Sequence, residues 1–262
     1  MKSSLNKEKL IIAHRGTRGL TSTENSYEAF DKTLDLGGEW VELDVRKTKD
    51  EKFIAFHDEN IDGEPVSSMS FIEIKEKRKE IETLEDILSK YKNKLKFDIE
   101  IKEEGNEEKI LKIVKKYLFP KDFFISSFSE ETLLKVKGLA PEVKTGLLID
   151  KNKNIIKKFF SFFPEKKLKK VKADFVIAHY STTKLLFFQR MKHLKIPVFV
   201  WTVNSEKKLK KLLKKSLDGI ITDRLDRGLK IKREGNITVP KNFVLEKGNK
   251  IKYFERTGEG EN

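Results

Sequence analysis

Hydrophobic and polar residues alternate strictly over residues 41–46, which read Val-Glu-Leu-Asp-Val-Arg. A period of two residues is typical of a β-strand, so Glu42 and Asp44 fall on the same face of the predicted strand. After a polar turn, a second extended stretch at residues 53–58 ends with His57. The pattern therefore brings two carboxylates and an imidazole to one end of one sheet.

A simpler interpretation is that Glu42 and Asp44 form the solvent-exposed face of an antiparallel strand, because half-buried strands commonly alternate in this way. Two further stretches argue against it. Residues 11–16 read Ile-Ile-Ala-His-Arg-Gly, and residues 97–102 read Phe-Asp-Ile-Glu-Ile-Lys. Each is an apolar strand that ends in charged or imidazole groups, so three successive strands predict a catalytic rim.

Strands and helices alternate along the rest of the chain. Short apolar runs predict strands at residues 10–13, 39–45, 95–101, 123–126, 144–149, 173–178, 197–203 and 217–222. Apolar residues at helical spacing predict helices at residues 27–34, 71–90, 106–117, 129–137, from about 153, 182–194, after Ser205 and 223–230. Eight such units with apolar strands predict a parallel sheet closed into a (β/α)8 TIM barrel of the α/β class. The active site of such a barrel lies at the carboxyl ends of its strands.

The ends of several helices are marked by capping residues. Asn25, followed three residues later by Glu28, predicts the start of the first helix. Ser205 is expected to cap the helix that follows it, and Gly138 is expected to end the helix at 129–137.

The regular pattern ends after Ile231. We therefore assign residues 1–231 to the barrel domain and residues 232–262 to a C-terminal extension. In the extension, two apolar runs at 243–245 and 251–254 flank Gly-Asn and are compatible with a hairpin. The Gly-Glu-Gly-Glu-Asn tail at 258–262 is expected to be disordered.

The charge of the chain is strongly unbalanced. Its 262 residues include 56 Lys and Arg against 42 Asp and Glu, a formal net charge of +14. Such a charge favours anionic substrates, phosphorylated surfaces or nucleic acid as partners. Much of the excess is lysine along helix faces, as in residues 207–215, which usually forms a solvated surface. We expect no nucleic-acid partner, because no recognisable reading module accompanies the charge.

The chain has no cysteine, which excludes disulfides, thiolate metal sites and a cysteine nucleophile. Residues 1–9 are polar, and the apolar run at 10–13 is too short for a signal peptide or a membrane span. We therefore expect a soluble, cytoplasmic protein. Residues 155–163 contain four phenylalanines and precede a lysine-rich run, so this segment could dock on an anionic bilayer. We favour the alternative that these rings pack the fifth helix onto the barrel.

The sequence resembles the glycerophosphodiester phosphodiesterase family over about residues 10–229. The order and spacing of several motifs carry this resemblance. They are His14-Arg15-Gly16, Glu24-Asn25-Ser26, Glu42-Leu43-Asp44, His57-Asp58, Ile99-Glu100-Ile101-Lys102, Ser126-Ser127-Phe128, Trp201-Thr202-Val203-Asn204 and Gly219 to Asp223.

The resemblance implies a metal-dependent hydrolase that cleaves glycerophosphodiesters to an alcohol and sn-glycerol 3-phosphate. It implies that His14 and His57 are the general base and acid. It also implies that Arg15 and Lys102 contact the phosphate, and that the metal ligands are Glu42, Asp44 and Glu100. The sequence departs from the family pattern in three places. Thr23 replaces a common proline, an Arg-Thr-Thr run after His-Asp is missing, and the segment 59–81 is short. These departures leave the identity of the alcohol open.

The chemistry suits these residue types. Three carboxylates can hold one divalent cation, which offsets the charge of a phosphodiester, and hard oxygen ligands favour Mg²⁺ or Ca²⁺ over zinc. Imidazole has a pKa near working pH and can both accept and donate a proton, while Arg15 can bind a phosphate bidentately.

Two residues allow two interpretations each. Trp201 ends the seventh predicted strand and is either barrel core or pocket lining. We favour pocket lining, because that strand end opens on the site. Glu24 either takes part in catalysis or only serves the helix that begins beside it, and we favour the second.

Two other functions remain in view. The first is a barrel that binds small phosphodiesters without hydrolysing them, and the intact His14, His57 and three acids argue against it. The second is a phospholipase D activity on lysophospholipids, which would use the same chemistry. The sequence predicts no oligomeric state.

Overall fold

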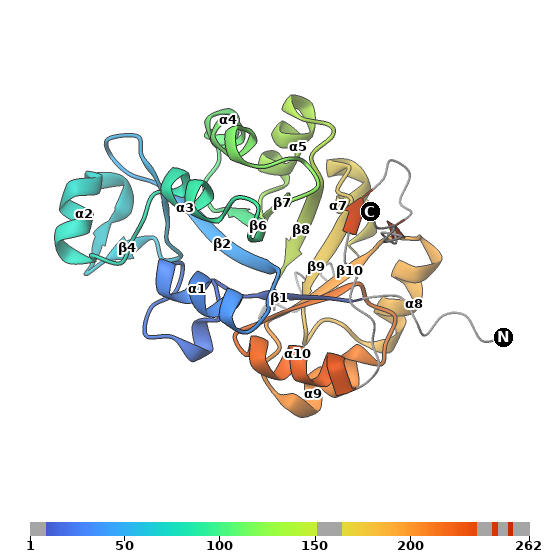
Figure 1. The fold of residues 1–262 in the computed structure, drawn as a ribbon. Coiled ribbons are helices and arrows are strands. Elements are labelled where there is room, and N and C mark those ends of the chain that lie inside the picture. The colour runs from blue at the N-terminus through green and yellow to red at the C-terminus, as the bar shows by residue number, and fades with distance from the viewer. Residues whose placement is uncertain (1–8, 151–163, 235–242, 246–250, 254–262) are drawn as a thin grey trace, which may run out of the picture.

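The computed structural model describes residues 9–150, 164–234, 243–245 and 251–253 (Figure 1). Eight parallel strands form a closed barrel, which confirms the predicted fold class. In barrel order these are β1 (Leu10–Ala13), β2 (Trp40–Lys47), β6 (Lys96–Ile101), β7 (Phe123–Ser127), β8 (Thr145–Ile149), β9 (Phe175–His179), β10 (Val198–Trp201) and β11 (Gly219–Thr222). The barrel closes because β1 pairs with β11 on one side and with β2 on the other.

The interior of the barrel is filled by large side chains. Phe124, Phe175 and Phe199 pack against one another with ring centroids 4.9–6.0 Å apart, and all are buried. Gly146 and Gly219 make room for them, since a Cβ at either position would lie 2.5 Å from a phenylalanine ring. The barrel interior is therefore a packed core, and the functional groups are confined to the rim at the carboxyl ends of the strands.

Amphipathic helices surround the barrel, each with an apolar side on the strands (Figure 1). They are α1 (Tyr27–Asp35), α3 (Leu84–Tyr91), α4 (Glu107–Tyr117), α5 (Glu130–Leu139), α7 (Glu165–Val171), α8 (Leu185–His193), α9 (Glu206–Leu213) and α10 (Leu225–Glu234). Among the described residues, no helix combines the length and the apolar character needed to cross a membrane.

An excursion after β2 interrupts the regular alternation. Its elements are β3 (Phe53–Ala55), β4 (Asn60–Ile61), β5 (Glu64–Pro65) and α2 (Phe71–Lys77). β3 pairs antiparallel with β2, as the sequence pattern predicts. A small separate core holds the excursion together; it comprises Ile54, Ile61, Val66, Met69, Ile74 and Ile81.

The prediction of one helix over 71–90 was wrong. The chain leaves α2 at Arg78 and forms an isolated bridge between Ile54 and Thr83. The Thr83 hydroxyl then accepts a hydrogen bond from the Asp86 N–H and starts α3. Ile81, between the two helices, packs in the small core, and this packing interrupts the predicted helix.

Two predicted helix ends differ, and a third is at the predicted position without its capping bond. The N-cap of α1 is Ser26, whose hydroxyl accepts from the Ala29 N–H, and not Asn25. Gly138 lies inside α5, which ends at Leu139. Ser205 occupies the N-cap position of α9 but makes no side-chain capping bond.

α10 runs to Glu234, past the boundary that the sequence placed after residue 231. In the extension, β12 (Phe243–Leu245) pairs antiparallel with β13 (Ile251–Tyr253). The helix predicted from about residue 153, the phenylalanine-rich stretch at 155–163 and the tail at 258–262 lie outside the described residues.

Candidate active site

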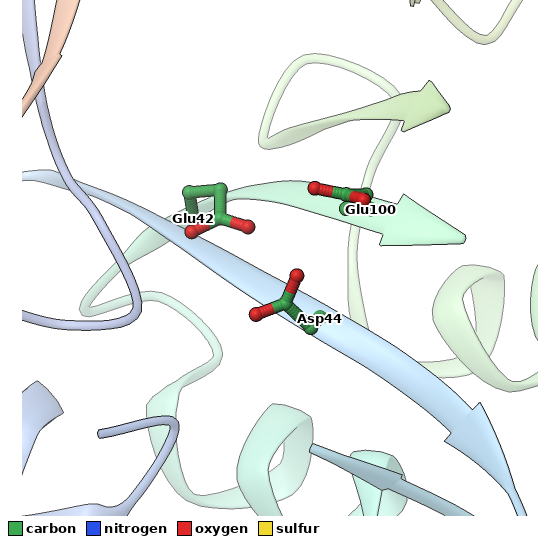
Figure 2. A group of neighbouring side chains, drawn as sticks. All are labelled: Glu42, Asp44 and Glu100. Atoms are coloured by element: carbon green, nitrogen blue, oxygen red, sulfur yellow. The ribbon is translucent and has the colours of Figure 1, made fainter. Parts of the chain in front are cut away.

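The acid cluster, which we define as Glu42, Asp44 and Glu100, lies at the carboxyl end of two neighbouring strands. Glu42 and Asp44 share one face of β2, and Glu100 on β6 is the register partner of Asp44. Figure 2 shows the three carboxyl groups gathered above these two strands. One oxygen from each lies within 4.8 Å of the others, and the residues are only 3%, 1% and 8% exposed. Their burial excludes the alternative that the two acids of β2 form a solvent-exposed face and agrees with the predicted rim.

Burial and mutual repulsion perturb these acids. Burial, with Asp44 and Glu100 nearby, raises the pKa of Glu42 well above its usual range, and burial together with Asp44 raises the pKa of Glu100 to about 7. Burial also opposes ionisation of Asp44, but Lys102 and Arg15 lower its pKa below the ordinary value. Glu42 Oε1 is buried without a hydrogen-bond partner among the described residues.

The acid cluster is therefore short of positive charge, because three adjacent buried carboxylates ionise together only if cations compensate them. A buried oxygen without a partner and three converging carboxylates fit a hard divalent cation. The cluster could therefore bind one metal ion.

Two basic residues contact the acid cluster. Lys102 Nζ lies 3.0 Å from Asp44 Oδ1 and 2.6 Å from Glu100 Oε1. Arg15 adopts a left-handed backbone conformation with φ of 50°, which lets its N–H donate to Glu42 Oε2 at 2.9 Å. The Arg15 guanidinium lies between Asp44 Oδ2 at 3.2 Å and Glu24 Oε1 at 2.7 Å. Glu24 thus orients the arginine as well as standing near the start of α1.

Both predicted catalytic histidines are held through Nδ1 by a carboxylate. His14 Nδ1 lies 2.6 Å from Asp223 Oδ1, and His57 Nδ1 lies 2.7 Å from Asp58 Oδ1. Since a carboxylate only accepts hydrogen bonds, Nδ1 carries the hydrogen and Nε2 of each neutral ring keeps its lone pair. His14 Nε2 lies 3.8 Å from Glu42 Oε2, so that this nitrogen faces the acid cluster.

His57 comes from the excursion and not from a barrel strand. The Phe56 N–H donates to the Asp44 carbonyl at 3.1 Å, and Arg46 Nε donates to the His57 carbonyl at 2.9 Å. Burial lowers the pKa of His57, partly offset by Asp44 and Asp58, so the ring is neutral at pH 7.

Sequence analysis named Asn25, Asn204 and Asp223 within motifs but gave none of them a role in orienting the site. Asp223 follows β11 and holds His14. The side-chain amide of Asn204 donates to the Asp223 carboxylate, and the backbone N–H of Asp223 donates to Asn204 Oδ1. Asn25 donates from its amide to Asp44 Oδ2 at 2.9 Å and accepts from the Asp44 N–H at 3.2 Å. Asp223 could have been found as one more acid at a strand end. Asn25 was assigned to a helix cap because the same residue type favours caps and left-handed turns.

Trp201 lies apart from the acid cluster, at the end of β10. Its ring packs edge-on against Phe128 and His179, with centroids 5.7 and 5.5 Å away, and contacts the aromatic core of the barrel. Phe128 is 44% exposed, so this aromatic group reaches the surface at the rim. The indole is partly buried, which leaves both core and pocket-lining roles for Trp201. His193 is exposed on α8.

Comparisons with known proteins identify the family of this chain. The model of the glycerophosphoryl diester phosphodiesterase family matches residues 14–227. A glycerophosphodiester phosphodiesterase of Caldanaerobacter subterraneus is 30% identical over 248 residues, which cover 86% of this chain and 98% of that protein. The structure of a glycerophosphodiester phosphodiesterase from Thermotoga maritima shares 29% identity with a TM-score of 0.72, covering 85% of this chain and 98% of that one.

A phosphodiesterase from Oleispira antarctica, solved with the product sn-glycerol 3-phosphate, has the same fold. Its TM-score to this chain is 0.73 at 23% identity, covering 86% of this chain and 97% of that one.

Proposed function

The chain belongs to the glycerophosphoryl diester phosphodiesterase family and is a glycerophosphodiester phosphodiesterase; from this premise we propose that it hydrolyses its substrates to an alcohol and sn-glycerol 3-phosphate with one divalent cation, Mg²⁺ or Ca²⁺. The observation that carries the proposal is the acid cluster with His14 Nε2 facing it at 3.8 Å. His57, held in the same tautomer, follows β3 beside the end of β2.

Glu42, Asp44 and Glu100 would hold the cation, which when bound offsets the charge of the phosphodiester and polarises its oxygens. Arg15 and Lys102 add positive charge for the phosphate. A guanidinium has five N–H groups, so Arg15 can keep its contacts with Glu24 and Asp44 and still donate to a phosphate oxygen.

Proton transfer falls to His14 and His57. One ring takes the proton of the attacking hydroxyl through Nε2 as its oxygen bonds to phosphorus. The other ring, in its protonated form, gives a proton to the leaving alkoxide as the P–O bond to the alcohol breaks, and water supplies the oxygen that the products gain. Asp223 and Asp58 fix the tautomers that expose Nε2 and stabilise each ring when it becomes charged. The low pKa of His57 suits acceptance of a proton at neutral pH.

Trp201 and Phe128 are placed to form an apolar wall for the substrate at the rim. Replacing Trp201 by Ala tests this role, since a wall that binds substrate changes KM more than kcat, whereas a purely structural ring changes the melting temperature instead.

The direct test is release of glycerol 3-phosphate from glycerophosphocholine. We expect turnover that disappears in chelator and returns with Mg²⁺ or Ca²⁺. If no diester is hydrolysed with any divalent cation, the barrel is a binding protein.

The alternative substrate class, lysophospholipids, is tested by assaying lysophosphatidylcholine at the same enzyme concentration. A higher kcat/KM for the lysophospholipid than for glycerophosphocholine would assign the enzyme to phospholipase D chemistry.

A further inference from the structure

Charge is divided unequally between two parts of the barrel. Residues 9–150 contain 25 Lys and Arg against 30 Asp and Glu, a net charge of −5. Residues 164–234 contain 20 Lys and Arg against 7 Asp and Glu, a net charge of +13. The positive charge of the protein is thus concentrated in the part of the barrel that carries α7, α8, α9 and α10 (Figure 1).

Both parts contain surface lysines that are paired with acids, such as Lys210 with Glu206 in the second part, and both contain lysines without an ion pair among the described residues, such as Lys94 and Lys112 in the first. The paired lysines of the first part come from several elements. Four examples with N to O distances of 2.6–3.1 Å are Lys47 with Glu51, Lys90 with Asp31, Lys115 with Glu142 and Lys135 with Glu131. In the second part, nine exposed lysines make no ion pair with any described residue. We call them the cationic face; they are Lys166, Lys169, Lys172, Lys192, Lys195, Lys207, Lys208, Lys211 and Lys214.

Helix geometry turns these lysines outward. On α9 and its C-cap, Lys207, Lys211 and Lys214 follow the spacing i, i+4, i+7 and so share one side of the helix. The buried Leu209 and Leu212 lie on the opposite side, against the barrel. Because these lysines make no ion pair with a described acid, their like charges repel one another, and an anionic partner would reduce this repulsion.

Exposed leucines lie on a helix of the same face. Leu186, in the first turn of α8, is 70% exposed, and Leu194, at its C-cap, is 43% exposed. Lysines beside exposed apolar side chains are the combination with which interfacial helices bind the headgroup region of a bilayer.

We propose that the cationic face docks on an anionic lipid bilayer. The face is made only of lysine, whose charge acts as a point attraction to a diffuse negative surface, whereas nucleic-acid recognition relies on the planar fork of arginine. The exposed leucines would contact the bilayer and contribute nothing to a phosphate backbone. This docking is independent of the hydrolytic reaction, because none of the nine lysines belongs to the active site.

The test is co-sedimentation of the full chain with vesicles of equimolar phosphatidylcholine and phosphatidylglycerol. We expect binding that weakens as salt rises, and no binding to pure phosphatidylcholine. The triple variant K207E/K211E/K214E should bind about 10-fold more weakly or worse, since three attractive charges become repulsive. Leu186→Ser should weaken binding to the anionic vesicles to a smaller degree.

A matched control separates local from net charge. The variant K94E/K112E/K121E changes three exposed lysines of the first part, so both triple variants lower the formal charge from +14 to +8. The control should bind like the wild type. Both variants should hydrolyse glycerophosphocholine at the wild-type rate, which shows that they are folded and keeps this test separate from that of the reaction.

Three results would overturn the proposal. They are no binding to anionic vesicles at low salt, equal losses in the two triple variants, and binding that the α9 variant leaves unchanged. Labelled duplex DNA is assayed in parallel. DNA binding that the α9 variant abolishes, without vesicle binding, would assign the face to nucleic acid instead.

Discussion

The two parts of the barrel use charge differently, although both repeat the same strand and helix unit. In residues 9–150, ionisable groups are buried at strand ends, and Lys102 compensates two of them, Asp44 and Glu100, at short distance. In residues 164–234, nine exposed lysines on the outer helices make no ion pair with a described residue. A buried charge must be compensated by a nearby partner, whereas an exposed one is solvated. Buried catalytic groups therefore require specific neighbours, whereas exposed lysines can interact with a binding partner.

The largest effect should come from the histidines of the first part. His14→Ala and His57→Ala should each reduce kcat by about 10²-fold or more, because each removes a proton-transfer group. His193→Ala, on the exposed end of α8, is the matched control and should leave kcat unchanged. Steady-state kinetics on glycerophosphocholine measure all three. Equal losses in the control, or none in His57→Ala, would contradict the assignment.

The next effect concerns Asn25, which orients Asp44 from a left-handed backbone position with φ of 52°. Asn25→Gly keeps that conformation but removes both hydrogen bonds to Asp44. It should weaken metal affinity roughly 10- to 100-fold, as loss of an outer partner of a ligand does. Asn93→Gly is the control, because Asn93 is exposed and has φ of 65°. Unchanged metal affinity in Asn25→Gly would show that Asp44 needs no such support.

Removing the metal should make stability depend on pH. Burial raises the pKa of Glu42 and Glu100 above 4.5, that of Glu100 to about 7, so the folded apoprotein binds more protons than the unfolded chain. The contribution of these groups to stability is full below pH 4.5 and is lost as pH rises through about 7, by on the order of 3 kcal/mol for a shift of this size.

Urea unfolding in chelator across this pH range measures the effect, with metal-saturated protein as the control. The saturated protein should lose this slope. The same slope in both samples would mean that the acid cluster does not bind the metal.

The smallest effect compares single surface lysines. Lys90→Gln removes the ion pair with Asp31 and the contact of the ammonium with the Tyr27 ring, 4.0 Å from its centroid. It should lower the melting temperature by roughly 1–2 °C at low salt. Lys211→Gln should cause no fall, because it removes a repelled charge. Equal decreases in both variants would remove the distinction drawn between the two parts of the molecule.

Strand periodicity predicts that Glu42 and Asp44 lie together, and the resemblance to the family added Glu100 as the third acid. Glu42 and Asp44 share a face through a period of two, and Glu100 follows from the next barrel strand. The barrel was equally accessible, because eight apolar runs alternate with helical patterns. Neither inference needs a contact between distant residues to be known.

The orienting residues could not be predicted, because their roles depend on tertiary contacts. Asp223 meets His14 only because β11 closes the barrel beside β1. Asn25 has a side chain that suits a helix cap, and only the position of Asp44 decides its role. The break between α2 and α3 likewise follows from the small core around Ile54 and Ile81.

The central claim is that the acid cluster holds the cation while the histidines transfer protons. Calorimetric titration of Mg²⁺ and Ca²⁺ into chelator-treated wild type, Glu42→Gln and His14→Ala, beside diester hydrolysis, tests it most directly. Glu42→Gln should bind metal more weakly and recover part of its activity in excess metal. His14→Ala should bind metal almost as the wild type does and recover nothing. Loss of metal binding in His14→Ala, or wild-type activity that survives chelation, would contradict the account.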